Sequence, residues 1–425
     1  MARRLIPFYG WILVTVMALC MTFIYGVRHS FSVFFSDILS EFGWSRGNVS
    51  IMFSLNIFAY GLFAPVAGTL ISHWRPRRLV LVGLTTLILA TAGCALAHEL
   101  WQFYILFGLL VPLGTAFSAW PVAGPTLTNW FIKKRGLVIG MAQTGSGVSF
   151  VYCIFVEWIM SQLGWRMAFV VLAGILLIVV WPLFFLFFHF KPEEKGLRPY
   201  GATEPLLQGD SVQAEKTPRN LEIRDRSLRE ILRTSQLWFL VIAYGLYWGI
   251  GCYLVLAHQV KFTEDVGYSS LFSASIFGLF GVAYLAGQLS GFVSDWIGRE
   301  YTGTIASSLA VMALWALLSV KDTEHSWLLY VYAIGFGYGI GLVTPTMFAS
   351  AADIFHDKHF GAVAGLLLTG MGVGGTIGPW LGGYLYDLTG SYRIAFLACM
   401  GCISVACLLL WLAAPRKAAR RTVRP

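Results

Sequence analysis

Charged residues are scarce in this chain of 425 residues. Only 12% of the residues are Asp, Glu, Lys or Arg, and 57% are hydrophobic. A soluble domain carries about 25% charged residues, and one with the present balance would expose large apolar patches and aggregate. The composition therefore excludes a water-soluble fold, and we expect the protein to lie in a lipid bilayer.

Sequence signatures of ATPases, common enzymes and sensors are also missing. The chain contains no G-x-x-x-x-G-K-[ST] phosphate loop, no His-rich metal cluster and no nucleophile elbow. The hydrophilic segments are too short to hold a signalling domain. We therefore predict neither an ATP-driven pump nor an enzyme nor a receptor, and we expect no catalytic residues, no metal and no cofactor.

The seven cysteines give no sign of disulfides, because all of them fall inside hydrophobic runs. Disulfides require cysteines in an oxidising compartment, normally on exposed loops. The Cys399-x-x-Cys402 pair has no further metal ligands nearby, which favours packing over a zinc site.

What the sequence does contain is a series of hydrophobic runs of about 20 residues, the length that crosses a bilayer. They predict an all-α integral membrane protein with twelve transmembrane helices in two pseudo-symmetric six-helix bundles. The first run is too long for a signal peptide and no cleavage site follows it, so we expect a retained helix. The runs lie near 9–34, 47–71, 79–98, 101–127, 136–160, 166–189, 236–258, 271–294, 302–320, 326–350, 361–386 and 392–413.

The net charge of +9 follows from topology rather than from a nucleic-acid partner. All but six of the 30 Lys and Arg residues fall on one side of the twelve runs. This bias places both termini in the cytoplasm of a multi-pass protein, and we expect a bacterial inner membrane. The six exceptions are Arg28, Arg46, Arg166, Lys261, Lys321 and Arg393.

The chain divides into two similar halves. A charged linker, residues 190–235, separates the predicted bundles 1–189 and 236–413, and a basic tail covers 414–425. RGLVIGMAQTGSGV (135–148) in the first half lines up with FGAVAGLLLTGMGV (360–373) in the second. Such repeats are typical of secondary transporters, which bind substrate between the repeats, and we expect this one to act as a monomer.

A cation interrupts the first run, in YGVRHSFSVFF (25–35). A charge at membrane depth costs at least ~2.5 kcal/mol. The guanidinium of Arg28 offers a two-donor fork for a carboxylate, which makes it the first candidate for substrate binding. Snorkelling of Arg28 to the headgroups is the alternative. His29 changes charge near neutral pH and is a candidate for proton coupling, or else a structural histidine.

One acid, Glu157, lies deep in a predicted helix. It is the second candidate for proton coupling, and two roles remain open for it: a permanent structural partner of Arg28, or a proton-controlled switch that releases Arg28. The predicted substrate site consists of Arg28, His29 and further polar side chains at membrane depth. These further side chains are Tyr25, Gln143, Tyr247, Tyr284 and Tyr338.

The segment GFVSDWIGRE (291–300) matches G-x-x-x-D-x-x-G-R and resembles the cytoplasmic signature of the major facilitator superfamily. The resemblance implies the superfamily's fold, and it implies that Asp295 pairs with Arg299 as a conformational gate. The first-half copy, GTLISHWRPRR (68–78), is degraded, because Ser72 replaces the acid.

A narrower resemblance is to the bacterial monocarboxylate-porter-like members. It rests on YGW (9–11), FGWSR (42–46), NWFIKKRGLVIGMAQTGSGV (129–148) and LGWRMAF (163–169). It implies transport of a small organic anion, a monocarboxylate, together with protons, and it aligns a functional lysine of the animal carriers with His29.

The chain also departs from that group. The carriers' aspartate and arginine in helix 8 match Ala283 and Gly287, and helix 11 carries no cation. The resemblance therefore does not supply the carboxylate clamp of the second half. The rival interpretation is an exporter of a neutral or cationic compound, in which Arg28 pairs structurally with Glu157.

Overall fold

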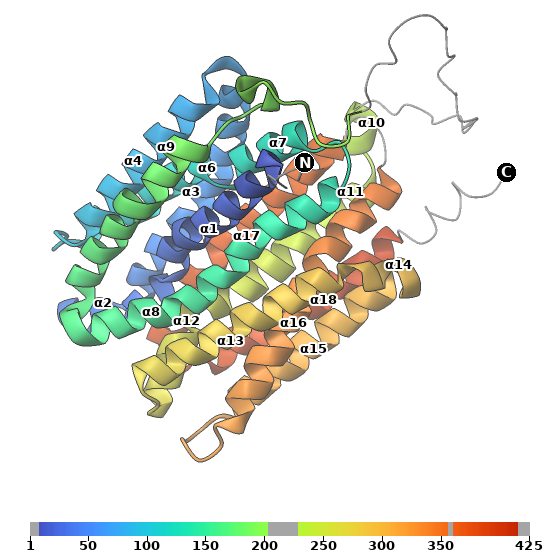
Figure 1. Cartoon of the computed structure of the whole chain (residues 1–425). Helices are drawn as coiled ribbons and strands as arrows, with labels where there is room; N and C mark the ends of the chain where they lie inside the picture. The colour runs from blue at the N-terminus through green and yellow to red at the C-terminus, as the bar shows by residue number, and fades with distance from the viewer. Residues whose placement is uncertain (1–7, 203–227, 356–359, 415–425) are drawn as a thin grey trace, which may run out of the picture.

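The computed structural model describes residues 8–202, 228–355 and 360–414. Within these ranges the regular structure is helical, apart from one isolated bridge between Phe131 and Tyr200. Figure 1 shows the helices side by side along one common direction. The helices are α1 Tyr9–His29, α2 Phe31–Phe42, α3 Arg46–His73, α4 Pro76–Cys94, α5 Leu100–Ile105, η1 Leu106–Leu110, α6 Val111–Ser118, α7 Trp120–Trp130, α8 Arg135–Ile175, η2 Leu176–Val180, α9 Trp181–Phe187, η3 Pro192–Lys195, α10 Leu228–Leu232, α11 Ser235–Tyr244, η4 Gly245–Cys252, α12 Tyr253–Val266, α13 Ser270–Leu289, η5 Ser290–Phe292, α14 Val293–Ile297, α15 Arg299–Ser319, α16 Trp327–Ile354, α17 Phe360–Thr389 and α18 Arg393–Ala413.

The described helices cross the bilayer twelve times, as the hydrophobic runs predict. Among the described residues, eleven helical segments are long and apolar enough to span it. One of them, Leu137–Phe187, holds two crossings, because α8 breaks at Gly164, whose φ of 79° only glycine adopts easily. Some crossings consist of several helical segments that follow one another directly. The seventh crossing, for example, runs from α11 through the π-helical segment η4 into α12.

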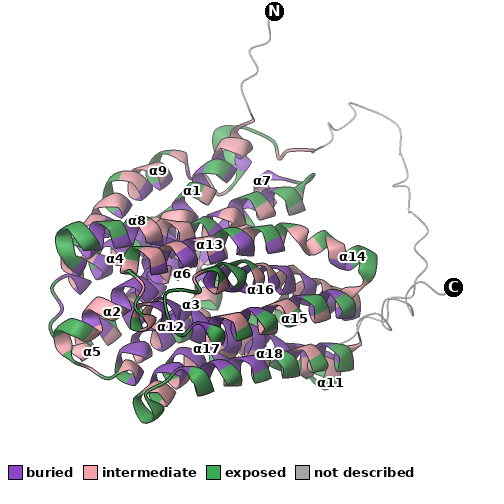
Figure 2. Cartoon of the chain, turned by 90° about the horizontal axis from the view of Figure 1, so that it is seen from below, coloured by how far each residue is buried: buried purple, intermediate pink, exposed green. Residues whose placement is uncertain are grey.

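The surface of the helices is suited to lipid. Large apolar side chains are exposed around the described structure, among them Leu89, Ile178 and Leu408. Buried residues predominate in the middle of the view in Figure 2 and exposed residues at its rim. A water-soluble protein would not expose so many apolar groups, whereas a bilayer solvates them.

The internal repeat is visible in the packing. Gly145 on α8 and Gly370 on α17 occupy equivalent positions of the repeated segment. A Cβ on Gly145 would stand 2.1 Å from the carbonyl oxygen of Ala18 on α1, and one on Gly370 would stand 2.5 Å from that of Val241 on α11. Each glycine thus lets its helix pack directly on the first helix of its own half.

In the described parts of the chain, most of the packing between the two halves comes from three helix pairs: α2 with α12, α3 with α17, and α8 with α13. We call the end of the structure that holds Tyr9 and Ala413 the terminal face, and the other end the opposite face. Near the opposite face, a Cβ on Gly383 would stand 2.6 Å from the backbone of Arg46. Nearer the terminal face, a Cβ on Gly68, Gly140 or Gly365 would meet no described atom within 4 Å. The halves are therefore packed together at the opposite face and separate toward the terminal face.

Candidate substrate site

Arg28 lies where the two halves meet. Its side chain is only 3% exposed, and its Nε and Nη2 atoms are buried without a hydrogen-bond partner. Its guanidinium carbon stands 4.8 Å from the ring centre of Tyr60 on α3 and 5.8 Å from that of Tyr253 on α12. A snorkelling arginine would instead reach the headgroups with an exposed side chain. The guanidinium is thus flanked by aromatic rings of both halves, with donors free for an anion.

Glu157 does not pair with Arg28 in this conformation. Glu157 lies on α8 and is buried, but the ion pairs formed by residues 8–202, 228–355 and 360–414 do not join it to Arg28. The structural pair required by the exporter interpretation is therefore not formed in this conformation.

His29 is held in a fixed orientation beside Arg28. Its Nδ1 lies 2.7 Å from the hydroxyl oxygen of Ser149, which itself donates to the carbonyl oxygen of Ser146 at 2.6 Å. Because the Ser149 hydroxyl proton is donated to Ser146, the Ser149 oxygen can only accept a hydrogen bond from His29. Nδ1 of His29 therefore carries a proton and donates it to Ser149. The ring also stacks on Phe150, with centroids 4.0 Å apart. These contacts leave Nε2 as the nitrogen of a neutral His29 that can accept a proton.

The second half contributes aromatic and polar groups at the same place. Tyr284 on α13 contacts Phe150 across the interface, with ring centroids 6.0 Å apart, and its hydroxyl accepts a hydrogen bond from Gln288 Nε2 at 2.7 Å. Trp248, in the π-helical segment η4, donates from Nε1 to the Thr344 hydroxyl at 2.8 Å. Segments of π-helix often occur at functional sites, and this one presents Trp248 toward Tyr253 and Tyr284.

The structure brings together some of the predicted substrate residues and leaves others apart. Tyr25, Arg28, His29 and Tyr284 belong to one group of contacting side chains. Tyr247 is 0% exposed, and its hydroxyl donates to the Gly339 carbonyl oxygen. Gln143 and Tyr338 are half-buried, and neither side chain makes a hydrogen bond or ring contact with the group in the described parts of the chain.

Sequence reasoning missed several members of this group. Tyr60, Phe150 and Trp248 carry no charge and stand in apolar runs, where aromatic residues are ordinary packing residues. The glycines around Trp248, in GLYWGIGC, signal close helix packing but not the direction of its side chain.

The predicted gate pair is present near the terminal face. Arg299 Nη1 lies 2.5 Å from Asp295, and Arg299 Nε lies 2.9 Å from Asp353, an acid on α16 that the sequence did not single out. The Ser294 hydroxyl accepts a further hydrogen bond from Arg299 at 2.6 Å. All these partners belong to the second half.

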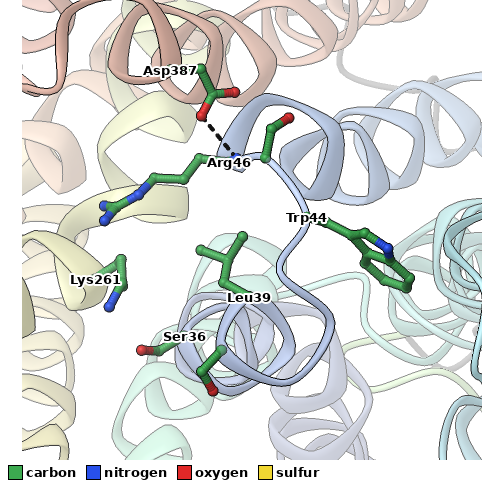
Figure 3. A pocket seen from close by; sticks show the side chains of 8 residues that line it. Ser36, Leu39, Trp44, Arg46, Lys261 and Asp387 are labelled. Carbon is green, nitrogen blue, oxygen red and sulfur yellow. Dashed lines mark hydrogen bonds between the residues drawn. The ribbon is translucent and has the colours of Figure 1, made fainter.

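At the opposite face, Arg46 joins the two halves. We call Arg46, Asp265, Asp387 and Tyr392 the latch. The Arg46 guanidinium contacts Asp265 at 2.5 Å and the Tyr392 hydroxyl at 2.8 Å, while its backbone N–H donates to Asp387 at 3.0 Å. Beside the latch lies a surface depression of about 340 Å³ (Figure 3). It is lined by Ser36, Leu39, Ser40, Trp44, Ser45, Arg46, Lys261 and Asp387.

The family model of the Major Facilitator Superfamily matches residues 17–351 and 324–424 of this chain. The chain belongs to the Major Facilitator Superfamily. The matched ranges cover most of the chain, so it is a transporter of this superfamily rather than an enzyme.

Relatives of this superfamily member include monocarboxylate transporters of animals. It is 25% identical to monocarboxylate transporter 13 of Rattus norvegicus, over 92% of this chain and 85% of that one. It is 26% identical to monocarboxylate transporter 11 of Mus musculus (92% and 84%) and 24% identical to monocarboxylate transporter 2 of Homo sapiens (94% and 84%). The resemblance to monocarboxylate transporters that the sequence motifs indicated is therefore confirmed.

Among solved structures, the chain matches a bacterial homologue of the human lysosomal transporter Spinster, in an inward-facing and unoccupied conformation. The TM-score is 0.66 at 18% identity, with 99% of this chain and 98% of that chain covered. This likeness supports the major facilitator fold.

Proposed function

We propose that this chain is a secondary transporter of a small monocarboxylate, working as a monomer by alternating access. The observation that carries the proposal is Arg28, which is buried between the halves with Nε and Nη2 unpaired. A buried charged donor without an acceptor is costly. A carboxylate supplies two acceptor oxygens in the geometry that the guanidinium fork fits. The relatives named monocarboxylate transporters point to the same substrate class.

Alternating access gives the two faces different roles. We take the terminal face as cytoplasmic, because the topology predicted from the sequence assigns most Lys and Arg residues to that side. The helices separate toward this face and the latch holds the opposite face together, so the conformation is one that exchanges substrate with the cytoplasm. Exposing Arg28 to the outside requires the latch to break, while the Asp295–Arg299 gate acts at the cytoplasmic end.

Proton coupling is assigned to His29 and Glu157. Moving a monocarboxylate together with one proton leaves the net charge transferred at zero, which avoids carrying an unpaired charge through the bilayer. His29 adjoins Arg28 in the chain and keeps Nε2 available, and Glu157 is a buried carboxylate free of the arginine. Both groups can therefore hold the coupled proton while substrate occupies the site.

The test uses purified protein in liposomes and counterflow of radiolabelled lactate, pyruvate and benzoate. Arg28→Gln should lower counterflow by at least about tenfold, because hydrogen bonds to charged groups contribute about 1.5–3 kcal/mol. The matched control is Arg393→Gln, which changes an exposed arginine at the start of α18. Wild-type counterflow in Arg28→Gln, at equal protein incorporation, would refute the assignment of Arg28.

Symport has a separate test. An inward proton gradient should drive accumulation of the carboxylate, and collapsing it with a protonophore should stop accumulation but leave counterflow. If uptake of a transported carboxylate does not respond to the gradient, the coupling is wrong and the substrate assignment stands.

A further inference from the structure

The side chains around Arg28 form a closed circuit of contacts that passes through both halves. We call these eight residues the collar: Tyr25, Arg28, His29, Tyr60, Phe150, Trp248, Tyr253 and Tyr284. In Figure 1 the helices that carry them, α1, α3, α8, α12 and α13, lie in the middle of the bundle, with η4 continuing into α12.

The first part of the circuit lies in the first half. Arg28 stands over the ring of Tyr60, and the Tyr60 hydroxyl is 3.2 Å from that of Tyr25. Tyr25 stacks on His29 with centroids 6.1 Å apart, and His29 stacks on Phe150. Five side chains of α1, α3 and α8 are therefore connected without a break.

The circuit closes through the second half. Phe150 contacts Tyr284 at 6.0 Å, Tyr284 contacts Trp248 at 5.7 Å, and Trp248 contacts Tyr253 at 5.6 Å. Tyr253 then returns to Arg28 at 5.8 Å. The circuit thus crosses the interface twice, at Phe150–Tyr284 and at Tyr253–Arg28.

Four rings of the collar are slightly more exposed than two fully enclosed tyrosines elsewhere in the second half. Tyr25, Trp248, Tyr253 and Tyr284 keep 9%, 7%, 6% and 6% of their surface exposed, whereas Tyr247 and Tyr332 keep 0%. The four collar rings are therefore nearly but not completely enclosed around Arg28 in this conformation.

We infer that the collar is the part of the site that selects substrate, and that the preferred substrate is a monocarboxylate with an aromatic or similarly bulky apolar body. This inference rests on the proposed function. Arg28 binds the carboxylate, and the faces of Trp248, Tyr253 and Tyr284 contact the body, in offset or edge-to-face geometry. Because Arg28 is the one permanent cation of the collar, a second carboxylate on the substrate would be buried without a partner.

The experiment compares transport of four acids by wild-type protein in liposomes: benzoate, phenylacetate, lactate and the dicarboxylate terephthalate. We expect KM values for benzoate and phenylacetate to be at least about tenfold below that for lactate, since aromatic contacts add to the shared carboxylate bond. Terephthalate should neither be transported nor inhibit.

Trp248→Leu should raise the KM for phenylacetate about tenfold and the KM for lactate by a clearly smaller factor, because lactate has no ring to contact Trp248. The matched control is Trp315→Leu, at an exposed position on α15. If Trp248→Leu is not recovered as a monodisperse protein, Trp248→Phe takes its place in the experiment. Trp248→Phe should also raise the KM for phenylacetate, but by a smaller factor.

The outcomes separate this inference from the proposed function. If lactate is carried in an Arg28-dependent manner while benzoate and phenylacetate neither enter nor compete, the collar assignment is wrong and the carboxylate transporter stands. If no carboxylate is carried or competes, both are wrong. If Trp248→Leu weakens lactate and phenylacetate equally, Trp248 does not determine specificity.

Discussion

Asp387 on α17 caps the start of α3 in the other half of the molecule. Its carboxylate oxygens accept hydrogen bonds from the backbone N–H groups of Arg46, at 3.0 Å, and Gly47, at 2.7 Å. A carboxylate at a helix N-terminus satisfies orphan donors and interacts favourably with the helix dipole. Figure 3 shows the first of these bonds at the edge of the depression. Asp387 is thus a helix cap that the second half supplies to the first helical turn of α3 in the other half.

Removing this cap should loosen the opposite face. Capping side chains contribute about 1 kcal/mol, so Asp387→Ala should raise the population of the open face roughly fivefold. The reporter is Ser50→Cys in a background without native cysteines, because Ser50 is buried beneath the latch, 3.4 Å from His258. Its labelling rate by a maleimide in detergent should rise accordingly.

The control for this measurement is Asp322→Ala, which changes an exposed acid in the loop between α15 and α16. It should leave the labelling rate of Ser50→Cys unchanged. Equal rates in Asp387→Ala and the unmodified background would show that the cap does not hold the face closed.

Two glycines on α17 should respond oppositely to the same substitution. A Cβ on Gly383 would stand 2.6 Å from the backbone of Arg46, whereas one on Gly365 would meet no described atom within 4 Å. Overpacking costs roughly 1–3 kcal/mol, while replacing an open helical glycine by alanine gains up to about 1 kcal/mol. Gly383→Ala should therefore lower the thermal unfolding midpoint and speed labelling of Ser50→Cys, and Gly365→Ala should do neither. Similar midpoints in the two variants would contradict the close approach of α17 to α3.

The crossings could be predicted from the sequence because the bilayer imposes one length on every apolar run. The predicted ends of the crossings are less accurate where a helix continues beyond its apolar run. The first crossing runs to Phe42 rather than to residue 34, since the segment after Phe35 is helical but carries Asp37 and Glu41. Gly164 likewise turns the chain without ending the helical pattern, so the fifth and sixth crossings form one segment.

The site was only partly predictable, because the position of a residue along one helix does not tell which other helix it meets. Arg28 was evident as a charge in an apolar run. Its neighbours Tyr60 and Tyr253 come from two other crossings, and the partners Arg46 and Asp387 are 341 residues apart in the chain. Only the assembled fold brings such pairs together.

Proton coupling should be separable from substrate binding by mutation. Counterflow requires no net proton movement, so Glu157→Gln should retain counterflow while losing accumulation driven by a pH gradient. Gln keeps the size of the side chain but holds no titratable proton. His29→Gln, measured in parallel, shows whether His29 shares this role. A Glu157→Gln variant that accumulates substrate like wild type would exclude Glu157 as the coupling group.

The two ion pairs of Arg299, with Asp295 and with Asp353, should contribute unequally to the stability of the folded protein. The Asp353 side chain is 26% exposed and the Asp295 side chain 60%, so solvent screens the bond to Asp295 more strongly. Exposed pairs contribute about 0.2–1 kcal/mol, and we expect Asp353→Ala to lower the unfolding midpoint more than Asp295→Ala. If Asp295 acts as a gate, Asp295→Ala should alter the transport rate despite its small effect on stability. A variant with both normal stability and normal transport would show that the Asp295–Arg299 bond is only a surface ion pair.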